Sequence, residues 1–152
     1  MKYRFKYLIF LFIILSFLGG ILEISYMLLI EHRFVIGGFF HAPIRPIYGF
    51  GGLLLFFMPA VLKKSNFLIF MSSFVICSIF EYLTSYLLEI IFNKIIWNYS
   101  NFFFNINGRI CLLHSIIWGV LGVLFIKVIQ PKIYRLYCSI KIKDNYINSR
   151  VE

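Results

Sequence analysis

The stretch WNYSNFFFNINGR, residues 97–109, decides how the rest of the chain is interpreted. It separates the last two long hydrophobic runs. Its asparagine and serine side chains carry hydrogen-bonding groups that hydrocarbon cannot satisfy, so it does not belong to a lipid-facing helix. Its tryptophan, tyrosine and phenylalanine rings are typical of the membrane–water interface. The stretch therefore predicts an ordered loop that covers one end of a small bundle of membrane helices.

Composition supports a membrane protein. The chain has 152 residues, of which 61% are hydrophobic and only 14% are charged, whereas soluble domains are nearer half apolar and a quarter charged. We expect a single transmembrane domain over residues 1–131 and a basic cytoplasmic tail over residues 132–152. The length leaves no room for a separate nucleotide-binding or catalytic domain.

The formal net charge of +9 has two interpretations. A basic chain can bind nucleic acid, but Lys and Arg here flank apolar runs, which is typical of the cytoplasmic membrane surface. We therefore expect the lipid bilayer, and no nucleic acid, as a partner. The three cysteines have no paired metal spacing, so we interpret them as packing residues rather than a disulfide or zinc framework.

Four hydrophobic runs predict four membrane helices, at about residues 7–30, 48–62, 66–92 and 109–129, with Pro131 ending the last. The expected fold is an all-α, four-helix integral membrane bundle with ordered outer loops. The first loop, residues 31–52, is rich in glycine and proline. Re-entry of this loop into the membrane stays open as an alternative to a surface loop.

Orientation follows from the distribution of Lys and Arg. With four spans, one side carries Lys2, Arg4, Lys6, Lys63, Lys64, Lys132, Arg135, Lys141, Lys143 and Arg150, and the other carries Arg33, Arg45, Lys94 and Arg109. The first side is predicted to be cytoplasmic. Both termini would then be cytoplasmic, and both long loops would lie on the outer face.

Polar residues within the runs predict a site near the outer surface. Glu23 and Glu81 lie roughly 24 and 22 Å from the inner edge, and His114 lies roughly 8 Å below the outer edge, at 1.5 Å per residue. These depths are similar in a core about 30 Å thick. Intramembrane ionisable residues are functional by default, although buried ion pairs that only fix helix register are the alternative. The candidate substrate-binding residues are Glu23, Arg45, Glu81, Glu89, Asn105, Asn107, Arg109 and His114.

Several chemistries are excluded or unsupported. The chain has no Gly-rich phosphate loop ending in Lys-Ser or Lys-Thr, no HExxH pair and no GxSxG elbow. We therefore predict no catalytic residues, no metal site and no cofactor, and we favour a protein that is not an enzyme. Trp97 and Tyr99 are interpreted as interface anchors, and Trp118 as a core or lipid contact.

Three blocks of sequence resemble a known bacterial family, the CmpB-like permeases of ABC-transporter type IV. The first contains Gly38-Phe39 and the run PIRPIYGFG from Pro43 to Gly51, and the second is Glu81-Tyr82-Leu83-Thr84-Ser85 with Glu89 and Phe92. The third is WNYS from Trp97, FNINGRICL from Phe104 to Leu112, and Trp118-Gly119. The resemblance covers roughly residues 17–131.

The resemblance implies a transporter subunit in the bacterial cytoplasmic membrane, with membrane or ATPase partner subunits and an oligomeric assembly. The chain departs from the family pattern at several positions. It has Asn98 where the family has Asp, Arg45 where it has Cys, Ala42 where it has Gly, and Ile36-Gly37 where it has Asn-Arg. The first two changes remove an outer carboxylate and add a cation.

Three functions follow as hypotheses. The first is a permease-like transport component with an outward-side pocket for a small polar solute or ion. The second is a membrane-embedded enzyme acting on lipid or cell-envelope substrates, with His114 or Glu81 as general base and Arg109 as an anion-binding group. The third is a structural or regulatory membrane subunit, whose ion pairs only hold the bundle.

Overall fold

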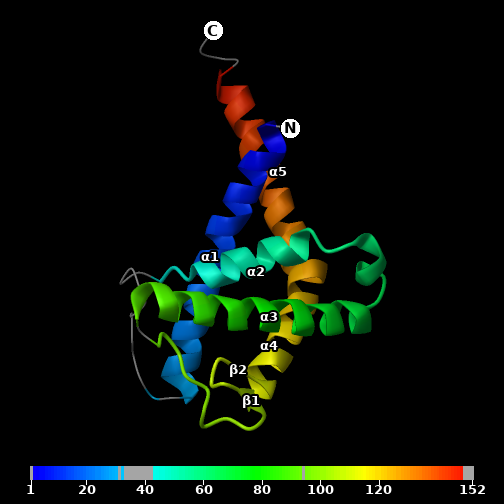
Figure 1. The fold of residues 1–152 in the computed structure, drawn as a ribbon. Helices are drawn as coiled ribbons and strands as arrows, with labels where there is room; N and C mark the ends of the chain where they lie inside the picture. The colour runs from blue at the N-terminus through cyan, green and yellow to red at the C-terminus, as the bar shows by residue number, and fades with distance from the viewer. Residues whose placement is uncertain (1, 31, 33–42, 94, 149–152) are drawn as a thin grey trace. The chain divides into compact units, whose positions relative to one another are not determined.

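The computed structural model describes residues 2–30, 32, 43–93 and 95–148 (Figure 1). Half of the first predicted loop, residues 31 and 33–42, lies outside these residues. The chain divides into two compact units. Unit 1 contains residues 1–53 and 127–152, and unit 2 contains residues 54–126.

The structure is mostly helical. The helices of unit 1 are α1 (Lys2–Ile30), most of α2 (Pro46–Phe56) and α5 (Gln130–Asn148). Unit 2 contains a 3₁₀ turn η1 (Ala60–Lys63), the helices α3 (Asn66–Phe92) and α4 (Leu112–Leu124), and an antiparallel hairpin of β1 (Asn105–Ile106) and β2 (Ile110–Cys111). The π-helical segment η2 (Phe125–Ile129) follows α4.

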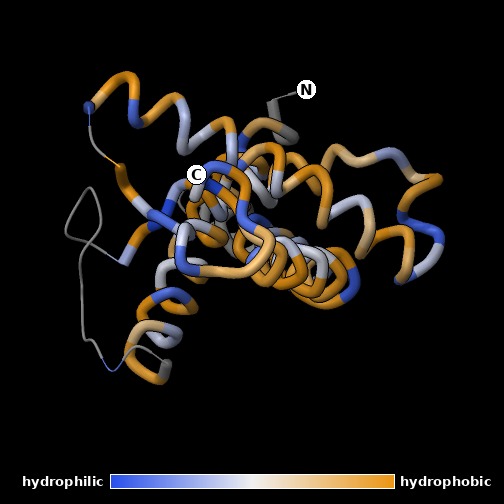
Figure 2. Tube along the Cα trace, turned by 60° about the horizontal axis from the view of Figure 1, so that its bottom comes forward, coloured by the Kyte–Doolittle hydropathy of each residue, from blue (hydrophilic) through white to orange (hydrophobic). Residues whose placement is uncertain are grey.

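Within the described part of the chain, three helical stretches are long and apolar enough to cross a membrane: Phe5–Leu29, Asn66–Phe92 and Leu112–Lys141. Figure 2 shows mainly hydrophobic residues along the trace of these helices. At most 28% of each stretch's most apolar window is buried within the protein, so most of its apolar side chains face outward. Such a surface is what lipid solvates and water does not.

The second predicted membrane helix is shorter than expected. α2 ends at Phe56 and has only 11 residues, and the chain resumes with η1 after Pro59, whose ψ of 143° is not helical. Proline carries no backbone N–H, so it cannot continue the hydrogen-bond ladder. A bundle of four membrane-spanning helices is therefore not established by the described residues.

The last helical run is longer than expected. Pro131 does not end it, because α5 continues to Asn148. The residue four positions before Pro131 is Lys127, which lies in η2. A proline ring clashes with the carbonyl at that position in a regular helix, and a π-type turn changes the local ladder. We attribute the passage through Pro131 to this turn.

Close backbone approach holds α1 and α2 together in unit 1. A Cβ atom at Gly49 would lie 2.6 Å from Cδ2 of Phe12, and one at Gly52 would overlap Leu15. The backbone N–H of Arg45 donates to the carbonyl of Ser16 over 2.9 Å. At the other end of α1, Tyr7 packs edge-on against Tyr134 of α5.

Unit 2 is built on the crossing of α3 and α4. The two hydroxyls of Ser78 and Ser115 are hydrogen-bonded at 2.7 Å. Gly119 lies one turn after Ser115 on α4 and meets the ring of Phe70. Gly122 lies two turns after Ser115 and meets Ser73. The small residues of α4 thus let it approach α3 closely.

Candidate functional site

One face of α3 carries the polar side chains of unit 2. The helix starts at Ser65, whose hydroxyl accepts a hydrogen bond from the N–H of Leu68, and ends at Asn93 in the left-handed conformation. Ser78, Glu81 and Ser85 are three or four residues apart, so they share one face, and all three are buried. Packing against α4 and the loop shields this face from hydrocarbon.

Glu81 is the buried carboxylate of this face. Only 4% of the residue is exposed. Its Oε1 accepts a hydrogen bond from Tyr99 Oη, and its Oε2 accepts one from Trp118 Nε1, each over 2.9 Å. In the part of the chain that the structure describes, Glu81 forms no ion pair. Its carboxylate is therefore held by two neutral donors, one from the loop and one from α4.

His114 lies beside this carboxylate's partners rather than on the carboxylate itself. Its ring stacks on Tyr99 with centroids 4.2 Å apart and an interplanar angle of 24°. Phe102 meets the same ring edge-on. The imidazole Nδ1 lies 3.1 Å from Sγ of Cys111. His114 thus positions Tyr99 by stacking and contacts the thiol at the start of α4.

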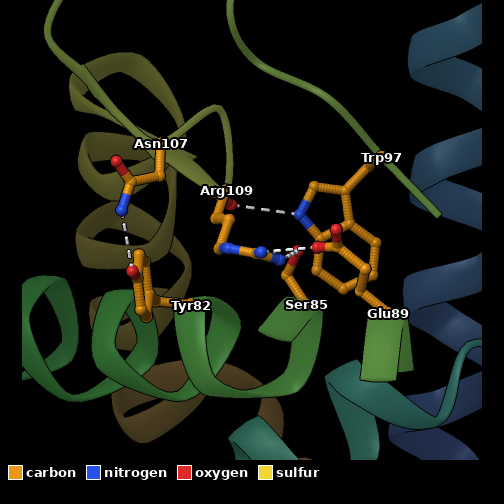
Figure 3. A network of polar contacts seen from close by, with 6 residues as sticks. All are labelled: Tyr82, Ser85, Glu89, Trp97, Asn107 and Arg109. Atoms are coloured by element: carbon orange, nitrogen blue, oxygen red, sulfur yellow. Dashed lines mark hydrogen bonds and ion pairs between the residues drawn. The ribbon is translucent and has the colours of Figure 1, made fainter. Parts of the chain in front are cut away.

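Arg109 forms a second polar group with the C-terminal half of α3 (Figure 3). Its guanidinium pairs with the carboxylate of Glu89 and donates to Ser85 Oγ over 3.3 Å. The rings of Tyr82 and Tyr86 lie 5.9 and 5.3 Å from its central carbon. Among the described residues, Arg109 thus pairs with Glu89 and not with Glu81.

The loop that carries Arg109 is folded by its own polar side chains. Asn105 donates through Nδ2 to the carbonyls of Ser100 and Phe102, and its Oδ1 accepts from the N–H of Gly108. Asn107 donates to the hydroxyl of Tyr82 over 2.9 Å. These bonds fix the hairpin against α3, which accounts for the asparagine content of this stretch.

The carbonyl of Arg109 accepts a hydrogen bond from Trp97 Nε1 over 3.1 Å, as Figure 3 shows. Trp97 therefore holds the loop closed rather than acting only as an interface anchor. That this loop is ordered stays a prediction from the sequence.

Glu23 and Arg45 form a separate pair in unit 1. Nε of Arg45 donates to Oε1 of Glu23 over 2.8 Å, and the two side chains are 10% and 27% exposed. The backbone bond from Arg45 to Ser16 fixes the same segment on α1. The Arg that replaces the family's Cys thus has a local acidic partner.

The predicted site residues therefore fall into three groups. Glu81 and His114 share Tyr99, while Glu89, Asn107 and Arg109 form the network of Figure 3, with Asn105 shaping the loop between them. Glu23 and Arg45 pair with each other.

Sequence reasoning did not assign site roles to Tyr99, Trp118 and Cys111. The contact of Trp118 could have been predicted from the sequence. A buried indole N–H needs an acceptor, and the carboxylate of Glu81 can supply one.

A cavity of about 290 Å³ lies next to the Glu81 group. It is open on one side and is lined by α3, the hairpin and the start of α4, and most of its lining residues are apolar. Its polar wall is the Ser78–Ser115 hydroxyl pair. Within the residues that the structure describes, no group of three or more His, Cys, Asp or Glu side chains could hold a metal ion.

These features define the class of the protein. Three long apolar helices, a buried carboxylate between two of them and an ordered polar loop are typical of a helical membrane protein. A family model described as "Putative ABC-transporter type IV" matches residues 10–149. The chain belongs to this family. No curated protein and no solved structure matches the chain.

Proposed function

We propose that the chain is a membrane-embedded component of an ABC-type transport system, and that the Glu81 carboxylate is the centre of its solute site. The observation that carries this proposal is a buried carboxylate within an apolar helix, held by neutral donors alone. Placing a carboxylate in such surroundings is costly, and structural helix packing does not need it.

The chemistry of this carboxylate favours a particular class of solute. Each of its oxygens accepts one hydrogen bond from the protein, and a carboxylate oxygen has a second lone pair available. A cation or a solute with an ammonium group complements such an acceptor. An anionic solute does not, because the guanidinium of Arg109 is already paired with Glu89. We therefore infer a small cationic or amine-bearing solute.

The remaining predicted residues support this site from outside. Arg109, Asn105 and Asn107 hold the loop that brings Tyr99 onto Glu81, and His114 stacks on Tyr99. We propose that the loop faces the outer side of a bacterial plasma membrane, with both termini cytoplasmic. Oligomers and ATPase or membrane subunits complete the transport system in this proposal, in keeping with the family's description.

The test is the isosteric change Glu81→Gln in the purified protein, with Glu89→Gln as the matched control on the same helix. Thermal stabilisation is measured against alkali and alkaline-earth cations, simple amines and amino acids. We expect one class to stabilise the unmodified protein and the Glu89→Gln variant but not Glu81→Gln. Loss of protein abundance in Glu81→Gln, with no ligand that stabilises the unmodified protein, would instead make Glu81 a structural clamp.

One observation favours a second candidate, an enzyme acting on lipid substrates. The 3.1 Å between Cys111 Sγ and His114 Nδ1 lies within the distance of a thiol and its general base, and Cys111 lines the apolar cavity. Cys111→Ser should then abolish turnover of a lipid ester or thioester while leaving binding to Glu81 intact. Unchanged membrane lipid composition on deletion of the protein would exclude this candidate.

A further inference from the structure

The cavity beneath the hairpin is apolar on most of its sides. Phe74 of α3, Ile110 of β2 and Leu112 of α4 supply its walls. The two hydroxyls that reach it, Ser78 and Ser115, bond to each other over 2.7 Å. Among the residues that the structure describes, no charged one lines it. A polar solute would lose its hydration there without gaining partners, so the cavity suits an apolar ligand.

The rim of the cavity is apolar and exposed. Phe104 and Ile106 line the cavity while being 81% and 55% exposed. Phe104 has a φ of 51°, a conformation that bulky residues rarely adopt. Asn105 holds the backbone on either side of it through Phe102 and Gly108. The loop thus maintains an unfavourable backbone conformation that keeps an aromatic side chain at the cavity mouth.

The size and surroundings of the cavity restrict its occupant. About 290 Å³ is at the lower end of ligand pockets, and a partner helix about 10 Å across does not fit. The cavity lies between the middle of α3 and the start of α4, and both helices belong to stretches apolar enough to cross a membrane. The apolar molecules present at that depth of a bilayer are lipid chains.

We propose that this cavity binds one acyl chain of a bilayer phospholipid. The chain passes Phe104 and Ile106 and ends against Phe74 and the Ser78–Ser115 pair. This site is distinct from the carboxylate of the proposed solute site, but the two share helices. Glu81 lies one turn beyond Ser78 on α3, and Trp118 lies one turn beyond Ser115 on α4. Occupation of the cavity therefore stabilises the helix pair that holds Glu81.

The experiment uses the full chain in nanodiscs of phosphatidylcholine that carries a photoactivatable diazirine near the end of one acyl chain. After illumination, cross-linked residues are mapped by peptide mass spectrometry. We expect enrichment at Phe74, Ile110 and Leu112 over the outward-facing residues Ile79 and Leu83 of α3. Ile106→Trp fills the mouth. Excluding roughly two methylene groups predicts about a tenfold loss of cross-linking inside the cavity.

The matched control is Phe103→Trp, which adds an indole to the same loop at a residue that is 90% exposed and does not line the cavity. It should leave the pattern unchanged. Equal labelling of cavity and outward-facing residues would show ordinary annular lipid and overturn the proposal. An equal loss of cross-linking in Ile106→Trp and Phe103→Trp would overturn it as well.

Native mass spectrometry of the detergent-purified wild-type protein gives an answer that does not depend on the variants. One retained phospholipid is expected, and complete delipidation under conditions that preserve the fold would also overturn the proposal.

Discussion

At the scale of single residues, Arg109 is a predicted site residue whose side chain joins the loop of residues 97–109 to α3. Its guanidinium reaches Glu89 and Ser85, and its carbonyl accepts from Trp97. The planar fork of an arginine can serve two acceptors at once while lying against aromatic rings, which the ammonium group of lysine cannot do. Arg109 therefore connects the loop to α3 through its side chain, while its backbone carbonyl closes the loop on Trp97.

Arg109→Ala should lower the free energy of unfolding by about 1–2 kcal/mol, because Glu89 and Ser85 lose a donor while Glu89 can be rehydrated. Arg109→Lys should recover less than half of this loss. Unfolding in mixed micelles measures both. A double-mutant cycle with Glu89→Gln should give a coupling energy of about 0.5–1 kcal/mol. A coupling near zero would show that the ion pair contributes nothing.

Gly108 and Asn93 both have a left-handed backbone conformation, and substitutions at the two residues should affect stability differently. Gly108 has a φ of 67°, and a Cβ there would lie 2.6 Å from both Asn98 Oδ1 and Ser100 Oγ. Gly108→Ala should cost about 1–3 kcal/mol. Asn93, with a φ of 51° at the end of α3, should tolerate Asn93→Gly without loss, since glycine is the preferred residue there. Thermal unfolding of both variants measures the difference, and a loss in Asn93→Gly would contradict it.

At the scale of helices, the α3–α4 crossing depends on how each glycine of α4 meets its neighbour. Gly119 faces the far end of the Phe70 ring, which can turn aside. Gly122 faces Ser73 close to its Cβ, which cannot move without the backbone. The two glycines therefore have different tolerance for an added methyl group, although both are buried on the same helix.

Gly122→Ala should destabilise unit 2 by about 1–3 kcal/mol through overpacking, and Gly119→Ala should cost less. Ser73→Gly removes the atoms that the new methyl group would meet, so it should partly rescue Gly122→Ala but not Gly119→Ala. Unfolding in mixed micelles ranks the four proteins. Equal losses in the two alanine variants would show that both contacts relax alike.

Sequence alone predicted the three long membrane helices, because hydrophobic runs of that length have few other structures. It also predicted that residues 97–109 form an ordered loop, since polar groups and aromatic rings alternate there. It placed the end of the second helix beyond Pro59 and the end of the last at Pro131. Whether a proline ends a helix depends on the backbone hydrogen bonds around it, as the π-helical segment η2 illustrates. No pattern of residue types encodes those hydrogen bonds.

The partners of the site residues were less predictable. Glu81 and Trp118 are 37 residues apart, and Glu81 and Tyr99 are 18 residues apart. Helical spacing defines a face of α3, but not which side chains of another element reach it. The assignment of Arg109 to Glu89 instead of Glu81 depends on the hairpin geometry, which a φ of 67° at Gly108 helps to set. Such long-range geometry is absent from local periodicity.

At the scale of the whole molecule, the number of membrane crossings decides the orientation. With 11 residues, α2 is about 16 Å long, which is shorter than a hydrocarbon core of about 30 Å. With four crossings, ten Lys and Arg residues lie on one side of the membrane and four on the other. With three crossings, nine lie on one side and five on the other. Four crossings therefore give the stronger positive-inside bias. Both arrangements place residues 97–109 outside and the C-terminus inside, but they place the N-terminus on opposite sides.

A cysteine at the exposed Asn101, in a Cys138→Ser background, should react with a membrane-impermeant maleimide in intact cells. A tag before Met1 should be reached only after permeabilisation, as four crossings require. A tag that is accessible in intact cells would establish three crossings instead. Failure to label the Asn101→Cys variant in intact cells would contradict both arrangements. A tag after Glu152, detected only after permeabilisation, is the control for membrane integrity.

The distance along the chain between Glu81 and its donors has a consequence for biosynthesis. Trp118 is translated 37 residues after Glu81, which takes about 2–7 s at ordinary rates of chain elongation. During that interval the carboxylate of α3 exists without the indole that will accompany it. We expect α3 to wait beside the insertion machinery until α4 has emerged, so that the two helices enter the lipid together as a hairpin.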